Sequence, residues 1–211
     1  MFGIHSRRGA LIVFEGCDRA GKSTQCKKLV EALHQKNIEA EYMSFPDRTT
    51  AVGQLINDYL MKNIDLTDNA IHLLFSANRW EMEPKMKSLI SKGVTLVVDR
   101  YAYSGIAFSA AKKGMDLEWC KKAETGLPKP DVVFFLSLSP EVLSKRGGFG
   151  TERYEVTEIQ KEVRNNFLKL ADDSWKVINA DQEVDVLHQD ILSHALSVIK
   201  NAESKPLGYL W

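Results

Sequence analysis

The chain has 211 residues, and its 28 lysines and arginines balance its 28 aspartates and glutamates. This balance argues against a protein that coats nucleic acid, because such a protein needs an excess of basic side chains. The length fits one α/β domain over residues 1–211, and no change of composition along the chain suggests a second.

Cysteine content and hydropathy predict a reducing compartment and no membrane partner. Cys17, Cys26 and Cys120 include no C-x-x-C pair, which argues against a disulfide framework or a zinc site. No apolar run has the length of a membrane span, and residues 1–9 lack the hydrophobic core of a signal peptide. We therefore expect a cytoplasmic protein, and its presence in the nucleus stays open.

Strand-like and helix-like segments alternate along the chain. Short apolar runs predict strands at Leu11–Phe14, Tyr42–Phe45, Val94–Val98, Val132–Leu138 and Lys176–Ile178. Helical periodicity predicts helices over Ser23–Gln35, Ala51–Lys62, Asp68–Ser91, Val156–Ala171 and Glu183–Asn201, with Pro84 kinking or interrupting the third. Strands that are apolar on both faces predict an α/β fold, a parallel sheet covered by helices on both sides.

A phosphate-binding motif lies between the first strand and the first helix. Residues 16–23 fit G-x-x-x-x-G-K-[ST], the P-loop. Gly16 and Gly21 let the backbone N–H groups turn toward phosphate oxygens, and the helix N-terminus adds partial positive charge. Lys22 is expected on the terminal phosphates and Ser23 on Mg²⁺. A chance match is the alternative, and the strand and helix on either side argue against it.

Polar clusters follow three further strands, at the sheet edge where ligands bind. They are Phe45-Pro46-Asp47-Arg48, Asp99-Arg100-Tyr101 and the turn Ala180-Asp181-Gln182. Asp99 is predicted to hold Mg²⁺, with helix N-capping as the alternative. Arg100 offers a planar fork for two phosphate oxygens, with an ordinary salt bridge as the alternative. Arg48 is expected to bind the acceptor phosphate, with a solvated charge on a surface loop as the alternative.

Three other features suggest contacts to a nucleotide. Phe75 and Arg79 are four residues apart, so they share a helix face that could stack on and hydrogen-bond a nucleobase, although a core role for Phe75 is equally open. Arg19 inside the P-loop could bridge two phosphates and stabilise transferring charge, or it could point to solvent. Residues 145–154 combine glycines with cations and predict a lid over phosphates, with a plain surface loop as the alternative.

The chain resembles the thymidylate kinase family along nearly all of its length. The matching segments are Arg8–Gly16, Asp18–Gln25, Phe45–Arg48, Leu73–Trp80, Val94–Tyr101, Gly126–Asp131 and Pro206–Trp211. The P-loop alone indicates only nucleotide binding, whereas the D-R-Y triplet together with L-F-S-A-N-R-W is far more specific. The pattern is similar to the eukaryotic and poxviral branch, in which the working arginine lies in the P-loop.

The resemblance implies a P-loop NTPase fold with a five-stranded parallel sheet, a mobile lid over about residues 143–160, and a homodimer. It implies the transfer of a phosphoryl group from ATP to dTMP with Mg²⁺, in the biosynthesis of dTTP. ATP would be held by the P-loop, and Arg146 and the turn at Asp181 would lie near adenine. The P-loop residues in this set are Gly16, Arg19, Ala20, Gly21, Lys22, Ser23 and Thr24.

The resemblance also implies a dTMP site. Phe75 would stack on thymine and Arg79 would bond the base, while Arg48 and Arg100 would hold the phosphate. Asp18 would meet the sugar 3′-hydroxyl and Phe108 would crowd the 2′ position. The other residues implied for this site are Phe45, Gly105, Tyr154 and Gln160. Arg19, Lys22, Arg100 and Asp99 would form the catalytic set, with Ser23 and Asp99 on the metal.

Three positions depart from the family pattern, namely Cys17, Asp47 and Tyr103. None removes a charge from the expected mechanism, but Tyr103 could alter the shape of the substrate pocket. Two alternative functions remain at this point. A deoxynucleoside kinase would phosphorylate thymidine, and a non-enzymatic nucleotide switch would release no ADP in response to an acceptor; no N-K-x-D guanine-reading motif is present.

Overall fold

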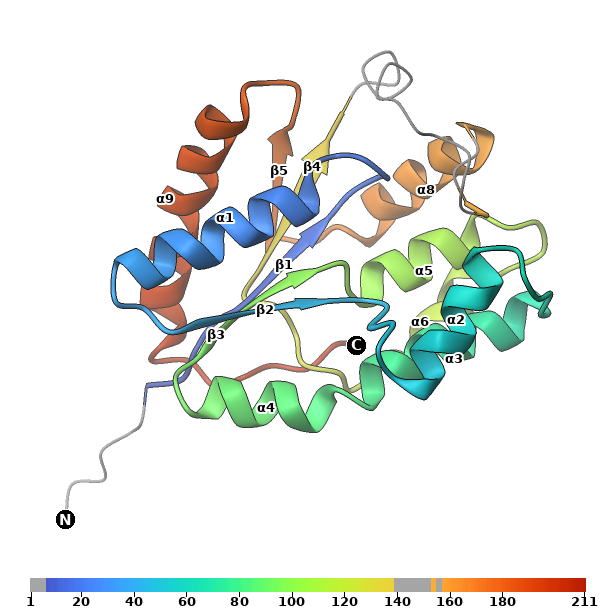
Figure 1. Cartoon of the computed structure of the whole chain (residues 1–211), viewed down its shortest axis with the longest axis horizontal. Coiled ribbons are helices and arrows are strands. Elements are labelled where there is room, and N and C mark those ends of the chain that lie inside the picture. The colour runs from blue at the N-terminus through green and yellow to red at the C-terminus, as the bar shows by residue number, and fades with distance from the viewer. Residues whose placement is uncertain (1–6, 139–152, 155–156) are drawn as a thin grey trace.

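The computed structural model describes residues 7–138, 153–154 and 157–211. A parallel sheet runs through the molecule in the order β2-β3-β1-β4-β5, with helices on both faces (Figure 1). The strands are β1 (Leu11–Glu15), β2 (Ala40–Ser44), β3 (Thr95–Asp99), β4 (Val132–Ser137) and β5 (Trp175–Asn179). All five predicted strands are confirmed, each within two residues at its ends.

Alternate residues of the central strands enter two different cores. Leu11 and Val13 of β1 face one core, whereas Ile12 and Phe14 face the other. The second core is closed by two helices that cover the same face of the sheet in Figure 1, α1 (Lys22–Gln35) and α9 (Val184–Ala202). Burial on both faces explains why these strands are apolar throughout rather than alternating.

The opposite face carries the remaining helices. They are α2 (Ala51–Leu60), α3 (Asp68–Trp80), α4 (Glu83–Ser91), α5 (Ala102–Ala110), α6 (Leu117–Lys122) and α8 (Thr157–Leu170). The predicted interruption near Pro84 is confirmed, because α3 ends at Trp80 and the proline lies in the first turn of α4, where a missing N–H costs nothing. No helix in the described ranges is long and apolar enough to cross a membrane.

Two helices were missed by the periodicity. Helix α5 is buried over eight of its nine residues, so no polar face marks it in the sequence. Helix α6 has only six residues, and Asp116 caps it by accepting a hydrogen bond from the Trp119 amide. Both lie between β3 and β4, and α5 brings its N-terminus to the carboxyl edge of the sheet.

Candidate active site

The P-loop joins the end of β1 to the start of α1. Gly16 has φ 142° and Gly21 has φ 91°. A side chain at Gly16 would place its Cβ 2.6 Å from the Leu136 carbonyl oxygen, so glycine is required there. The loop curls around the Lys22 ammonium, which donates to the carbonyls of Gly16 at 3.1 Å and Cys17 at 2.8 Å. The α1 N-terminus and this ammonium make the loop a site for anions.

Lys22 is buried among charges of both signs. Burial and the nearby Arg100 guanidinium lower the pKa of Lys22 to about 8, and Asp18 and Asp99 only partly oppose this effect. An ammonium poised in this way gains strongly from an arriving anion, because the anion restores the favourable field that water would have supplied. The environment of Lys22 therefore favours a phosphate-bearing ligand.

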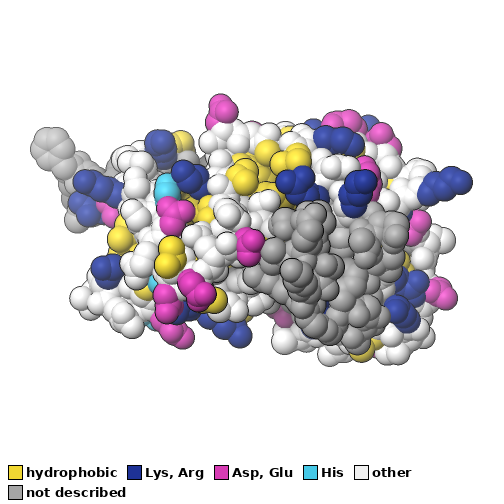
Figure 2. Space-filling model, turned by 90° about the horizontal axis from the view of Figure 1, so that it is seen from above, with side chains coloured by type: hydrophobic (Ala, Val, Ile, Leu, Met, Phe, Trp, Pro, Cys, Tyr) yellow, Lys and Arg dark blue, Asp and Glu magenta, His cyan; other side chains and the backbone are white. Residues whose placement is uncertain are grey.

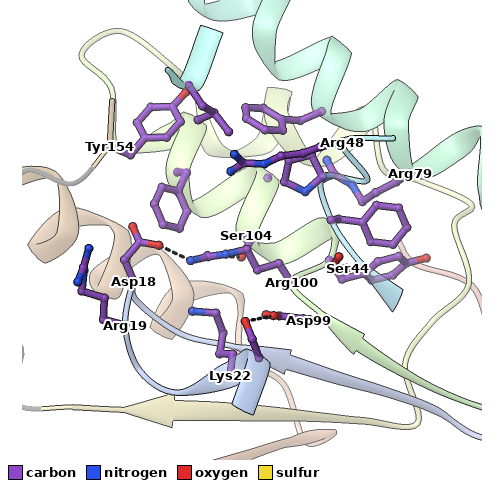
Figure 3. Close-up of a pocket in the computed structure, with 18 of the residues that line it drawn as sticks. Asp18, Arg19, Lys22, Ser44, Arg48, Arg79, Asp99, Arg100, Ser104 and Tyr154 are labelled. Carbon is purple, nitrogen blue, oxygen red and sulfur yellow. Dashed lines mark hydrogen bonds and ion pairs between the residues drawn. The ribbon is translucent and has the colours of Figure 1, made fainter. Parts of the chain in front are cut away.

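Asp99 ends β3, and its carboxylate accepts a hydrogen bond from the Ser23 hydroxyl (Figure 3). Tyr42 donates to the same oxygen at 3.4 Å. The capping alternative for Asp99 is wrong, because Tyr101 is the N-cap residue of α5 and Glu15 accepts hydrogen bonds from the backbone N–H groups of Tyr101 and Ser104. Asp99 is thus directed to the P-loop.

A hydroxyl and a carboxylate in contact are hard oxygen ligands that suit Mg²⁺. In the described ranges, no group of three or more His, Cys, Asp or Glu side chains could hold a metal on its own. Mg²⁺ is usually held by one or two protein oxygens plus substrate phosphates and water, so Ser23 and Asp99 fit the ion without a protein cage.

Arg100 spans the cleft from the end of β3. Its backbone has φ 65°, a strained conformation for a residue with a side chain. Hydrogen bonds on both sides keep the backbone in this conformation. The Arg100 amide donates to the Phe14 carbonyl, and the Glu15 carboxylate accepts from the Tyr101 amide and the Ser104 hydroxyl. The guanidinium forms an ion pair with Asp18, bonds Ser104 at 3.2 Å and lies 5.2 Å from the centre of the Phe108 ring.

Asp18 is shared between Arg100 and Gln160. Gln160 donates to the Asp18 carboxylate at 2.6 Å and accepts from the Asp18 amide at 3.2 Å. Burial opposes ionisation of Asp18, but Arg100 and Lys22 outweigh it and lower the pKa of the carboxyl. Gln160 also donates to the Tyr154 carbonyl at 3.0 Å, which links α8 to a ring that lines the cleft.

An aromatic ring and an arginine lie together in the cleft on α3. Phe75 is half-buried and packs against the core while also lining the cleft, so its core role is confirmed and its contact with a nucleobase stays a prediction. Arg79 is buried and held by Glu124, and Gly105 of α5 lies against its guanidinium. The shared helix face predicted for Phe75 and Arg79 is confirmed.

The loop after β2 is held by Asn78. This buried side chain accepts from the Asp47 amide at 2.7 Å and donates to Glu81 at 2.6 Å and to Thr50 at 3.1 Å. Arg48, the next residue of the loop, donates to Asn57 at 2.8 Å and lines the cleft. Asn78 therefore fixes the loop from which Arg48 reaches the ligand space.

These side chains line one cleft of about 400 Å³. In Figure 3, the P-loop residues Arg19 and Lys22 lie across it from Arg48 and Arg79. Figure 2 shows basic and acidic side chains interspersed on the face that it draws. The cleft lining, by contrast, has five arginine or lysine side chains against two aspartates. The lining includes these residues expected from the sequence: Asp18, Arg19, Lys22, Ser23, Phe45, Arg48, Phe75, Arg79, Asp99, Arg100, Gly105, Phe108 and Tyr154.

Other expected residues lie beside the cleft or outside the described ranges. Gln160 reaches it through Asp18, and Asp181 is exposed after β5, beyond β4 from the P-loop. Gly16, Ala20, Gly21 and Thr24 belong to the P-loop and the first turn of α1 without lining the cleft. Arg146 lies outside the described residues, as does most of the lid expected at 143–160.

The expectation that Tyr103 shapes the pocket is wrong. Its ring packs edge-on against Trp175 at 4.9 Å and Trp211 at 5.7 Å between centroids, and it is not among the residues that line the cleft. Tyr103 therefore belongs to an aromatic cluster with Trp175 and Trp211 rather than to the cleft wall.

Several residues of the site were missed by the sequence reasoning. Tyr42, Ser44, Leu60 and Ser104 line the cleft, Glu124 binds Arg79, and Glu15 accepts a hydrogen bond from Ser104. Two of them carried a usable signal. Glu15 is a charged residue at the end of an apolar strand, and Ser104 follows Arg100 by four residues.

Comparison with known proteins decides the family. The model of the thymidylate kinase family matches residues 14–191. A thymidylate kinase from Danio rerio is 54% identical over 97% of this chain and 98% of its own length. The chain belongs to the thymidylate kinase family. The human thymidylate kinase is 51% identical, covering 98% of this chain and 99% of its own.

Two further relatives extend the comparison with this family. A putative thymidylate kinase of Invertebrate iridescent virus 6 is 50% identical over 90% of this chain and 89% of its own. The structure of the Candida albicans thymidylate kinase has a TM-score of 0.88 and 37% identity, covering 98% of this chain and all of the other. Its likeness confirms the P-loop NTPase fold expected from the sequence.

A thymidylate kinase is a nucleoside-monophosphate kinase that uses ATP as phosphoryl donor. As a member of this family, the protein phosphorylates dTMP to dTDP in dTTP synthesis. Relatives that match at this identity over nearly the whole chain are thymidylate kinases. The two alternative functions, a thymidine kinase and a non-enzymatic switch, are therefore not favoured.

Proposed function

We propose that the cleft binds ATP and dTMP end to end, with Arg100 at the point where their phosphates meet. The observation that carries this proposal is the position of Arg100, which pairs with Asp18 of the P-loop and also lies over the Phe108 ring. A guanidinium held beside the P-loop in this cleft can bind the acceptor phosphate next to the donor.

The dTMP site is proposed at the α3 end of the cleft. Phe75 stacks on thymine and Arg79 hydrogen-bonds its edge, while Arg48 and Arg100 hold the phosphate. Asp18 accepts a hydrogen bond from the sugar 3′-hydroxyl, for which its lowered pKa supports the ionised form. Phe108 fills the space beside C2′, and Phe45 and Gly105 complete the walls.

The ATP site is proposed along the P-loop, from Gly16 to Thr24. Ser23 and Asp99 hold Mg²⁺, which supplies charge neutralisation for the phosphates when bound. Arg146 and Asp181 are proposed near adenine. The exposed position of Asp181 after β5, on the P-loop side of the sheet, supports an open adenine site rather than a deep one.

Phosphoryl transfer needs positioning and charge more than covalent help. We propose that Lys22, Arg19 and Arg100 surround the transferring group. The nucleophile is a phosphate oxygen of dTMP, which is already ionised at neutral pH, so no strong general base is required. Tyr154 and Gln160 exclude water from this region, supported by the bond from Gln160 to the Tyr154 carbonyl.

We also propose that residues 1–211 form one kinase domain that pairs into a cytoplasmic homodimer. The single domain is supported by two cores that share one sheet. Dimerisation is supported by exposed leucines on two adjacent helices, Leu55 on α2 at 38% and Leu73 on α3 at 49% exposure. Three free cysteines support a reducing compartment.

One assay tests the proposed reaction. ADP formation is measured by enzymatic coupling with ATP and Mg²⁺, using dTMP, dUMP, dCMP, AMP and thymidine as separate acceptors. We expect the largest kcat/KM with dTMP and no turnover with thymidine, which lacks the phosphate for Arg48 and Arg100. Turnover of thymidine above dTMP would overturn the proposed acceptor site.

A further inference from the structure

Arg79 and Glu124 form an ion pair that water hardly reaches. The exposed fraction is 2% for Arg79 and 0% for Glu124. Arg79 lies in the last turn of α3, and Glu124 follows the end of α6. The Nε of the arginine donates to Oε2 of the glutamate at 2.8 Å, and its Nη2 donates to Oε1. This side-on, two-bond geometry fixes the plane of the guanidinium.

Gly105 of α5 restrains the same guanidinium from a second direction. A Cβ at Gly105 would lie 2.4 Å from Nη2 and 3.1 Å from Nη1 of Arg79. The helix backbone therefore lies directly against the guanidinium, and a residue with a side chain would push it away. Glu124 and the backbone of α5 together restrain Arg79 to one orientation.

One nitrogen of Arg79 is left for a ligand. Among the described residues, Nη1 has no hydrogen-bond partner, and Arg79 lines the cleft together with Phe75. Arginine nitrogens only donate hydrogen bonds. Because Glu124 cancels the charge of the pair, this end of the cleft suits a neutral acceptor atom better than a second phosphate.

We propose that Glu124 is a positioning residue that sets the base specificity of the enzyme. By holding Arg79, it presents fixed N–H donors to the pyrimidine edge and so favours a carbonyl oxygen over an amino group. This inference rests on the proposed function, in which Arg79 bonds the base. Thymine and uracil carry a carbonyl at position 4, whereas cytosine carries an amino group whose N–H would face another donor and leave both unpaired.

The test compares Glu124→Gln with a matched control on α6, the helix that precedes Glu124. Glu118→Gln makes the same chemical change in α6, where Glu118 pairs with Lys121 and its side chain is 67% exposed. For each variant and the wild type, kcat and KM are measured with dTMP, dUMP and dCMP, together with KM for ATP. Thermal unfolding of each variant is followed in parallel.

For Glu124→Gln we expect the ratio of kcat/KM for dTMP over dCMP to fall about tenfold or more. The amide can accept one bond from Arg79, but its own N–H group faces the guanidinium and displaces it. The loss should appear in KM for dTMP and dUMP, with KM for ATP nearly unchanged, and Glu118→Gln should match the wild type. An equal loss for dTMP and dCMP would show a merely structural role and overturn the proposal.

A conservative variant covers the case in which Glu124→Gln does not fold. Glu124→Asp keeps the charge but withdraws the carboxylate by one methylene group, so we expect a selectivity between those of the wild type and the glutamine variant. A wild-type ratio in Glu124→Asp would overturn the proposal.

Failure of the proposed function gives a different result. If Arg79→Gln keeps the wild-type preference for dTMP over dCMP, Arg79 does not read the base. If Arg79→Gln loses that preference while both Glu124 variants keep it, the proposed dTMP site stands and only the role of Glu124 is wrong.

Discussion

The guanidinium of Arg100 is paired with the carboxylate of Asp18, so the segment after β3 is linked to the P-loop by one ion pair across the cleft (Figure 3). The two residues are 82 positions apart in the chain. Both side chains are about one-fifth exposed, which leaves them open to a ligand. The pair joins the proposed donor and acceptor sites.

Asp18→Asn should weaken recognition of the sugar. An amide oxygen accepts a hydrogen bond less strongly than a carboxylate, and hydrogen bonds to charged groups contribute about 1.5–3 kcal/mol. We expect the preference for dTMP over its 3′-deoxy analogue to narrow by about tenfold. Steady-state kinetics with both acceptors measures this ratio. Asp185→Asn, which alters an exposed pair with Lys28, serves as the control, and an unchanged ratio would exclude the 3′-hydroxyl contact.

Arg19→Ala and Lys22→Ala should lower kcat by about 10²–10³, the usual cost of one preorganised donor at developing charge. Arg19 lines the cleft and has φ 63°, an unfavourable conformation that suits a site residue more than a surface one. Single-turnover kinetics at saturating ATP and dTMP separates the chemical step from binding. Near-normal turnover of either variant would refute its assigned role.

The pH dependence of kcat/KM for ATP should follow the ionisation of Lys22. With a pKa of about 8 in the free enzyme, this lysine loses its proton as the pH rises through that value. We therefore expect kcat/KM for ATP to fall above about pH 8, and Lys22→Arg to lack this decline because arginine stays protonated. A profile of kcat/KM that stays flat well above pH 8 in the wild type would contradict the assignment.

The shifted pKa of Lys22 also makes the stability of the fold depend on pH. Folding lowers the pKa of Lys22 from 10.5 to about 8, so between these values the unfolded chain binds the proton more tightly than the native protein. The contribution of Lys22 to stability should rise with pH over this window. The difference in unfolding free energy between the wild type and Lys22→Met, measured at pH 8 and 10, isolates this contribution.

Gly105→Ala should displace Arg79, because the added Cβ would lie 2.4 Å from its Nη2. KM for dTMP is expected to rise at least about tenfold while KM for ATP stays unchanged. Gly208→Ala is the matched control, since its Cβ would meet Lys129 at an ordinary 3.5 Å. Wild-type kinetics in Gly105→Ala would mean that Arg79 does not need its observed position.

Asn78→Ala should loosen the loop that carries Arg48. The change leaves the Asp47 amide without its partner, and such a loss costs about 1–3 kcal/mol of stability. Chemical denaturation measures this loss, and KM for dTMP should rise with it. Asn63→Ala removes only an exposed bond to Asp58 and should change neither; equal effects from both variants would argue against the anchoring role.

Local patterns in the sequence predicted the parts of the site that need only neighbouring residues. The P-loop is eight consecutive positions, and its glycines adopt the positive φ angles that the motif requires. Phe75 and Arg79 follow from helical spacing alone. The residues at the ends of β1 and β3 followed from the rule that parallel strands end at one edge.

The tertiary structure alone decided which groups hold these residues in place. Glu15 reaches Ser104 across 89 positions, and Glu124 reaches Arg79 across 45. No local pattern encodes such pairs, since they depend on the strand order β2-β3-β1-β4-β5 and on the packing of α5 against α3 and α6. Helix α5 could not be predicted from the sequence, because it is buried on nearly all sides and so lacks the polar face that produces helical periodicity. Short sequence motifs thus predict the chemical groups of the site, whereas contacts between residues distant in the chain determine its geometry.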